Sequence, residues 1–113
     1  MIKTSAQKSK LKVHIIQQID RKVDLDEIAE TNGISMLELM NEIEHICYSG
    51  TRLNLDYYID QILDDDKQED IFDYFLNAET DSMKVALKDE DNQDYSEEEL
   101  RLMRIKFLSE YAN

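Results

Sequence analysis

The residues best suited to chemistry are basic side chains near the start of the chain. Residues 1–22 carry six basic side chains against one acidic, a net charge of +5, whereas the other 91 residues carry seven basic and 25 acidic, a net charge of −18. Lys and Arg bind phosphate backbones by displacing counterions, and an acidic surface repels them. The candidate nucleic-acid contacts are therefore Lys8, Lys10, Lys12, Arg21 and Lys22, together with Arg52. The alternative is that these side chains merely solvate a helix face.

Catalytic and metal-binding patterns are not evident. The two histidines and the single cysteine, His14, His45 and Cys47, do not have a zinc-site spacing. The aspartate-rich segments that start at Asp64 and Asp89 lack the glycine and the glutamate that a calcium loop needs. No phosphate-binding loop or nucleophile elbow occurs. We therefore predict no catalytic residue, no metal site and no cofactor in this chain.

The composition favours helices joined by short polar turns. The 113 residues include no proline and only two glycines, Gly33 and Gly50, so few chain breaks are expected. No apolar run approaches the roughly 18 residues of a membrane span, which predicts that no membrane is involved. One cysteine cannot form an internal disulfide, which favours a cytoplasmic protein.

Residues 1–55 are predicted to form a three-helix unit. An amphipathic helix is expected over residues 5–21, with apolar residues at helical spacing. Two capping boxes, Asp24 with Glu27 and Ser35 with Glu38, predict the starts of a second and a third helix. The second helix should stop near Asn32 and Gly33, since glycine adopts the left-handed conformation easily.

The spacing of small and apolar residues in this unit is typical of a helix-turn-helix. Ala29 lets the next helix approach closely, Gly33 provides the sharp turn, and Ile34 and Leu39 pin the third helix on the second. Residues 51–55 alternate like a half-buried strand and predict a rudimentary wing. The predicted fold class is mainly α, with a helix-turn-helix or degenerate winged-helix unit followed by an acidic helical extension.

The third helix lacks the side chains of a typical DNA-reading helix. Its outward charge is mainly negative, and a second, partly apolar line runs along it through Leu37, Asn41, Glu44 and Tyr48. Glutamates in a DNA groove would lie near phosphates, so this line is predicted to contact protein, with the C-terminal helices as the candidate cover.

Residues 56–113 are predicted to be an acidic helical extension packed on the first part as one domain. Helices are expected over 56–63, 67–78, 81–88 and 97–112, with polar loops over 64–66 and 89–94 and a capping box of Ser96 and Glu99 at the last helix. The last helix also offers a second, weaker basic patch of Arg101, Arg104 and Lys106. Five aromatic residues at helical spacing are expected to pack in the core rather than to stack on bases: Tyr57, Tyr58, Phe72, Tyr74 and Phe75.

Three stretches of the chain resemble the extreme C-terminal region of certain bacterial RecQ DNA helicases. They are KSKLKVHIIQQIDRKVDLDEIAETNG, YSGTRLNLDYY and EEELRLMRIKFLSEYAN, which together extend the similarity from about Lys8 to Asn113. The resemblance implies a helicase-associated helix-turn-helix domain within a longer protein that unwinds DNA in the 3′ to 5′ direction, with ATP and magnesium, in recombination and repair. None of the corresponding ATPase motifs is present in this sequence.

Two functions remain open at this point. The first is a non-catalytic accessory domain of such a helicase, in which the basic first helix helps to bind or position DNA. The second is an acidic interaction or autoregulatory module that docks on the helicase core or on another repair protein. A free-standing transcriptional regulator is disfavoured by the acidic third helix, and an independent enzyme by the missing motifs.

Overall fold

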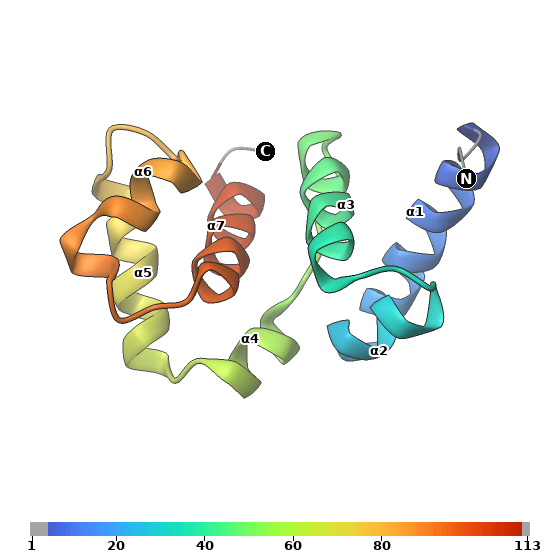
Figure 1. The fold of residues 1–113 in the computed structure, drawn as a ribbon, viewed down its shortest axis with the longest axis horizontal. Coiled ribbons are helices and arrows are strands. Elements are labelled where there is room, and N and C mark those ends of the chain that lie inside the picture. Colours follow the sequence, from blue (N-terminus) through green and yellow to red (C-terminus); the bar gives the residue numbers. More distant parts are fainter. Residues whose placement is uncertain (1–4, 112–113) are drawn as a thin grey trace. The chain divides into compact units, whose positions relative to one another are not determined.

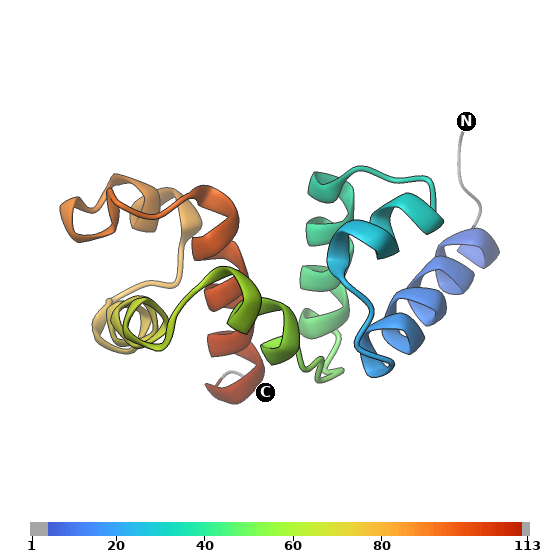
Figure 2. The ribbon, with the colours of Figure 1, turned by 90° about the horizontal axis from the view of Figure 1, so that it is seen from below.

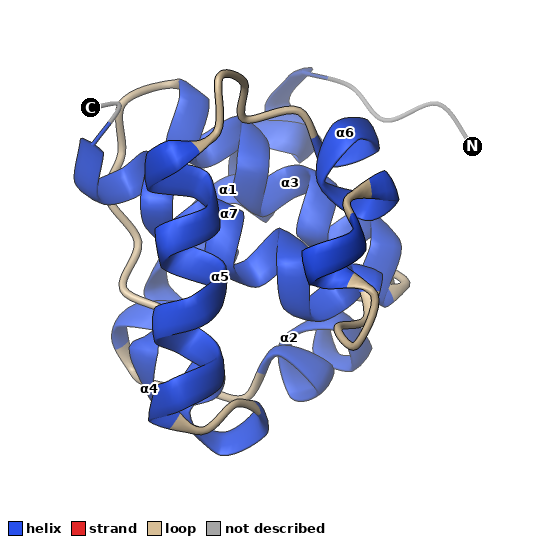
Figure 3. Cartoon of the chain, turned by 90° about the vertical axis from the view of Figure 1, so that its left-hand side faces the viewer, coloured by secondary structure: helices blue, strands red, loops and turns tan. Residues whose placement is uncertain are grey.

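The chain folds into helices and loops that divide into two compact units. The computed structural model describes residues 5–111, with side chains from Lys10 onward, and these described residues include no strand (Figures 1 and 3). The units comprise Met1–Asn54, here unit 1, and Leu55–Asn113, here unit 2. The mainly α fold class is thereby confirmed.

Unit 1 is the predicted three-helix unit. It contains α1 (Ser5–Asp20), α2 (Leu25–Thr31) and α3 (Met36–Tyr48), and each helix contacts the other two (Figure 2). All three helices contribute fully or nearly fully buried aliphatic side chains to one core: Ile15, Ile19, Leu25, Ile28, Leu39, Ile43 and Ile46. Ala29 is buried where α2 meets its neighbours, and Ile34 is half-buried just after the turn. These contacts match the helix-turn-helix pattern in the sequence.

Each of the three helices of unit 1 is followed by a left-handed residue, two positions after its last residue. Lys22, Gly33 and Gly50 have φ of 60°, 67° and 98°, respectively. At each helix end, the amide of the left-handed residue and the amide of the next residue both donate to carbonyl oxygens in the last turn. At α2, the Gly33 amide donates to the Glu30 carbonyl and the Ile34 amide donates to the Ala29 carbonyl. This is the Schellman motif, which satisfies the free carbonyls of a helix end. The predicted stop at Gly33 is confirmed, and Lys22 is the unusual member because it carries a side chain.

The two capping boxes predicted in unit 1 have different outcomes. At α3 the Ser35 hydroxyl accepts from the Glu38 amide at 3.1 Å, as predicted. At α2 Asp24 occupies the N-cap position, but its side chain makes no cap hydrogen bond, so that capping box was a wrong prediction. The Asp24 carbonyl still accepts from the Ile28 amide, because the backbone alone closes the first helical turn.

The predicted wing strand is also wrong. Residues 51–55 adopt no regular secondary structure, and no strand occurs anywhere in residues 5–111 to pair with them. Leu53 and Leu55 are nevertheless buried, at 5% and 3% exposed. Alternating burial thus reproduces the pattern of a strand, but a strand also needs a neighbouring strand for its backbone hydrogen bonds.

Unit 2 is built around its last helix. It contains α4 (Asp56–Ile62), α5 (Asp65–Asn77), α6 (Met83–Lys88), a 3₁₀ turn η1 (Glu90–Asn92) and α7 (Glu97–Tyr111), and α7 contacts α4, α5 and α6. The Ser96 and Glu99 capping box at α7 is confirmed, with the two bonds at 3.1 and 2.7 Å.

Two segments predicted as loops contain helical residues. The Asp64 carboxylate accepts from the Lys67 amide at 2.9 Å, so α5 starts at Asp65 rather than at Lys67. The predicted loop over 89–94 contains η1, whose first turn is closed by the Asp89 carboxylate. In both places an aspartate caps the start of a helix, whereas the sequence had predicted a solvated acidic loop.

Of the five aromatic residues predicted to pack in the core, two are buried and three are half-buried, and Phe72 and Phe75 contact Phe107 of α7. Phe107 lies 5.8 Å from Phe72 and 5.9 Å from Phe75, measured between ring centroids. Phe75 and Tyr58 are buried, at 2% and 6% exposed. Tyr57, Phe72 and Tyr74 are half-buried.

The predicted basic patch on the last helix does not form a free cationic surface. Arg104 is only 8% exposed, and its Nε donates to the Asp81 carbonyl oxygen. Lys106 forms an ion pair with Asp56 at 3.0 Å. The prediction was wrong because the spacing showed which side chains share a helix, and not which of them other segments of the chain cover or pair with.

Candidate nucleic-acid interface

The outward face of α1 carries the most suitable set of nucleic-acid contacts in the described residues. Lys10, His14, Gln17 and Arg21 follow one another at spacings of four, three and four residues, which places them in one row along the helix. All four are exposed, whereas Ile15 and Ile19 bury the opposite face. We call these four residues the α1 stripe. The sequence reading found Lys10 and Arg21 but missed His14 and Gln17, which the helical spacing from Lys10 already indicates.

Lys12 does not belong to the α1 stripe. Residues two positions apart on an α-helix point about 200° apart around its axis, so Lys10 and Lys12 cannot face the same surface. The Lys12 Nζ instead donates to the Ser49 Oγ at 3.2 Å, at the end of α3. The side chain of Lys8, also predicted as a contact, lies outside the described residues.

Arg21, Lys22 and Arg52 are all exposed but lie in different parts of unit 1. Arg21 directly follows the last residue of α1, where its amide still donates to the Gln17 carbonyl at 3.1 Å, and Lys22 lies in the left-handed turn that leads to α2. Arg52 lies in the loop after α3, three residues beyond the Ser49 that Lys12 contacts. The predicted basic residues therefore form two groups, one along α1 and its last turn and one near the end of α3.

The outward side of α3 has the acidic and apolar character expected from the sequence. Leu37 and Tyr48 are 62% and 60% exposed, Asn41 is exposed and Glu44 is half-buried. Glu38 adds a further exposed carboxylate in the first turn. Such a face is unsuited to phosphates, and its predicted contact with protein stays a prediction.

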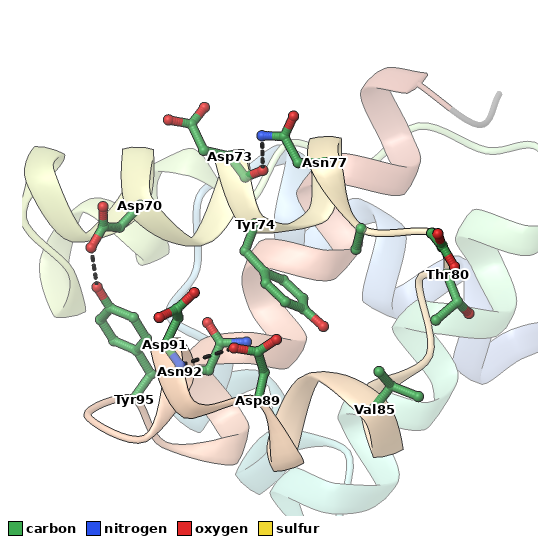
Figure 4. Close-up of a pocket in the computed structure, with 12 residues that line it drawn as sticks. Asp70, Asp73, Tyr74, Asn77, Thr80, Val85, Asp89, Asp91, Asn92 and Tyr95 are labelled. Carbon is green, nitrogen blue, oxygen red and sulfur yellow. Dashed lines mark hydrogen bonds between the residues drawn. The ribbon is translucent and has the colours of Figure 1, made fainter.

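Unit 2 contains an open groove with acidic walls. The groove has a volume of about 750 Å³ and lies between α5 on one side and α6 with η1 on the other (Figure 4). Its lining combines carboxylates with two tyrosines and two amides and includes Asp70, Asp73, Tyr74, Asn77, Glu79, Asp89, Asp91, Asn92 and Tyr95. We call it the acidic groove. Among the described residues no lysine or arginine lines it, so it repels phosphates and attracts cationic groups.

The two tyrosines of the acidic groove are held in their neutral form. Burial raises the pKa of Tyr95 to about 12, helped by the hydrogen bond from its hydroxyl to the Asp70 Oδ2 at 3.0 Å and by nearby carboxylates. Burial and the charge of Asp89 raise the pKa of Tyr74. The Tyr95 hydroxyl therefore keeps its proton at physiological pH and donates it to Asp70. Among residues 5–111 no three His, Cys, Asp or Glu side chains gather as a metal-ion site.

Taken together, the sharp turn at Gly33 and the shared core of the three helices define unit 1 as a helix-turn-helix domain. Residues 9–59 match the family model described as "RecQ-1-like, helix-turn-helix domain". The match covers most of α1, all of α2 and α3 and the start of α4. It confirms the resemblance to a RecQ C-terminal region for this part of the chain, and it ends at Ile59, before the last of the three resembling stretches.

Two further findings concern relatives of the chain and membrane-spanning helices. No curated protein matches the chain. None of the helices in the described part has both the length and the apolar character that crossing a membrane requires.

Proposed function

We propose that this chain is a non-catalytic accessory domain of a RecQ-like, ATP-dependent 3′ to 5′ DNA helicase that helps to hold DNA during recombination and repair in the cytoplasm. The observation that carries the proposal is the RecQ-1-like helix-turn-helix match over a unit whose first helix has an exposed polar face with a cation at either end. The helix α1 contains only one acidic residue, Asp20. In contrast, α2 and α3 together contain seven when their N-cap residues are included. DNA is therefore expected to contact unit 1 at α1.

The remainder of the helicase polypeptide is the first partner in this proposal. The sequence contains no G-x-x-x-x-G-K-[ST] loop to cradle nucleotide phosphates, so its residues do not fit ATP. ATP and magnesium would be bound elsewhere in the longer protein. The role of this chain is therefore to bind DNA. Its electrostatic contact keeps the DNA near the ATP-hydrolysing part of the helicase.

Fluorescence anisotropy of the full chain with single-stranded, duplex and forked DNA tests the proposal. Because the contact is mainly with phosphates, we expect a dissociation constant in the range of about 1–100 μM at physiological salt, with affinity falling as salt rises. The absence of binding to all three DNAs at 20 mM salt would refute a DNA-positioning role for this chain.

The acidic groove supports a second candidate function, in which unit 2 docks on a basic segment of the helicase core or of another repair protein. Unit 2 carries 18 acidic and six basic residues, and the groove gathers five of the carboxylates along one opening. Calorimetric titration with a lysine-rich peptide tests this function. We expect salt-sensitive binding that an Asp73→Asn, Asp89→Asn double variant weakens and an Asp26→Asn, Glu27→Gln control, which removes the same charge from α2, does not. Equal binding by both variants would mean that net charge alone attracts the peptide.

A further inference from the structure

The α1 stripe has its charged groups at its two ends. Lys10 and Arg21 are eleven residues apart, a distance of about 16 Å along the helix axis. His14 and Gln17 lie between them, and all four side chains are exposed. The stripe is therefore a straight polar row with a cation at each end and two hydrogen-bonding side chains in the middle.

This arrangement fits a double helix better than an unpaired strand. The major groove of B-DNA is about 12 Å wide, so a row of about 16 Å reaches from the phosphates on one edge to those on the other. Sites for unpaired bases stack them mainly on large aromatic side chains, and the α1 stripe contains no Phe, Tyr or Trp, its one aromatic ring being the small imidazole of His14. We infer that unit 1 lays α1, rather than α3, across a groove of duplex DNA, with Lys10 and Arg21 on phosphates of the two edges. This inference rests on the proposed function and adds to it the partner and the contacting residues.

The other basic and helical surfaces of unit 1 are less suitable for this contact. Lys12 points to the end of α3 and is engaged with Ser49. The N-terminal half of α3, which reads bases in a typical helix-turn-helix, presents Glu38 to solvent. Insertion of α3 would therefore bring a carboxylate toward phosphates, whereas approach through α1 brings the cations first.

The test compares two charge-matched double variants of the full chain on one fluorescein-labelled 20-base-pair duplex. Lys10→Gln with Arg21→Gln removes both ends of the stripe. Lys12→Gln with Lys84→Gln removes the same charge from the other side of α1 and from α6 in unit 2, where Lys84 is exposed. Circular dichroism verifies that each variant keeps its helix content. A single-stranded 20-mer of the same sequence serves as the second ligand.

The expected result is a change in the salt dependence of duplex binding. Each lost phosphate contact lowers the slope of log affinity against log salt by about 0.9, so the stripe variant should lose about 1.8. Between 50 and 200 mM salt its affinity then falls about 12-fold less than that of the natural chain, from the same slope. The control should keep the natural slope, and the single strand should bind more weakly than the duplex.

Three results would overturn the inference. If the stripe variant keeps the natural slope while the chain still binds DNA, the contact lies elsewhere and the proposed function survives. If the control loses as much slope as the stripe variant, binding follows net charge rather than the α1 stripe. If the natural chain binds no DNA at low salt, the inference and the proposed DNA role both fail.

Discussion

A substitution at Lys22 can measure how much a left-handed lysine after α1 lowers the free energy of unfolding of unit 1. Its φ of 60° lies in the left-handed region, where the Cβ of an L-residue is crowded against its own backbone. The equivalent position after α2 is Gly33, with φ of 67°, where a Cβ would meet no other atom within 4 Å. The penalty for a Cβ at Gly33 is therefore one of backbone conformation alone, and we expect the same at Lys22, whose side chain is exposed.

The perturbation is Lys22→Gly, with Lys22→Gln as its control. Both substitutions remove the charge near the C-terminal end of α1, and only glycine removes the backbone strain. The left-handed conformation costs a residue with a Cβ about 1–2 kcal/mol, which glycine avoids. Glycine also has more conformational freedom in the unfolded chain, and this offsets about 0.5–1 kcal/mol of the gain in stability. From the midpoints of these two ranges, the glycine variant should be more stable than the glutamine variant by about 0.75 kcal/mol.

Because the chain has two units, the assay must report on unit 1. Urea unfolding followed by hydrogen exchange at the amide of Ile19, a buried residue of α1, meets that need. In DNA titrations the two variants should lose the same affinity, since they lose the same charge. Equal stability of the glycine and glutamine variants would refute the reasoning, because it would show that the left-handed turn at Lys22 carries no strain in solution.

Three further predictions concern the capping, the core and the pH dependence. Ser96→Ala removes the hydroxyl that caps α7 and should cost about 1 kcal/mol in urea unfolding of unit 2, whereas Glu99→Gln keeps the reciprocal bond and should be nearly neutral. Ile43→Ala empties a fully buried site in α3 and should cost about 2–5 kcal/mol in thermal unfolding of unit 1, and a cost below about 1 kcal/mol would contradict the packing. The pKa of Tyr95 lies above the ordinary value for tyrosine, at about 12, so the folded chain holds this proton more tightly than the unfolded chain does. Its contribution to stability is complete below pH 10 and is lost as the pH rises from 10 to 12, and Tyr95→Phe should flatten that part of the stability curve.

The basic residues show how far sequence periodicity leads and where it stops. The charge of residues 1–22 predicted the region of the interface, but grouping Lys10 with Lys12 ignored the 3.6-residue turn of the helix that the same reading had predicted. Lys12 lies on the other side of α1 and contacts Ser49, 37 residues further along the chain. His14 and Gln17 were missed because they carry no fixed positive charge, although their spacing from Lys10 places them in the same row.

The local elements were determined by the sequence itself. The helices, the turn at Gly33 and the capping boxes at Ser35 and Ser96 depend on residues within four positions of one another, so composition and spacing were sufficient to predict them. The helix-turn-helix core followed as well, since the apolar rows of three short helices in one unit can be buried only against each other.

Only the tertiary structure decided which side chains are free for function. The burial of Arg104 against Asp81, the pairing of Lys106 with Asp56 and the opening of the acidic groove between α5 and α6 all join residues far apart in the sequence. The loop over 51–55 is a similar case, because its leucines are buried without a partner strand. The physical reason is that a helix determines only the angle between its own side chains, whereas exposure depends on where the rest of the chain packs.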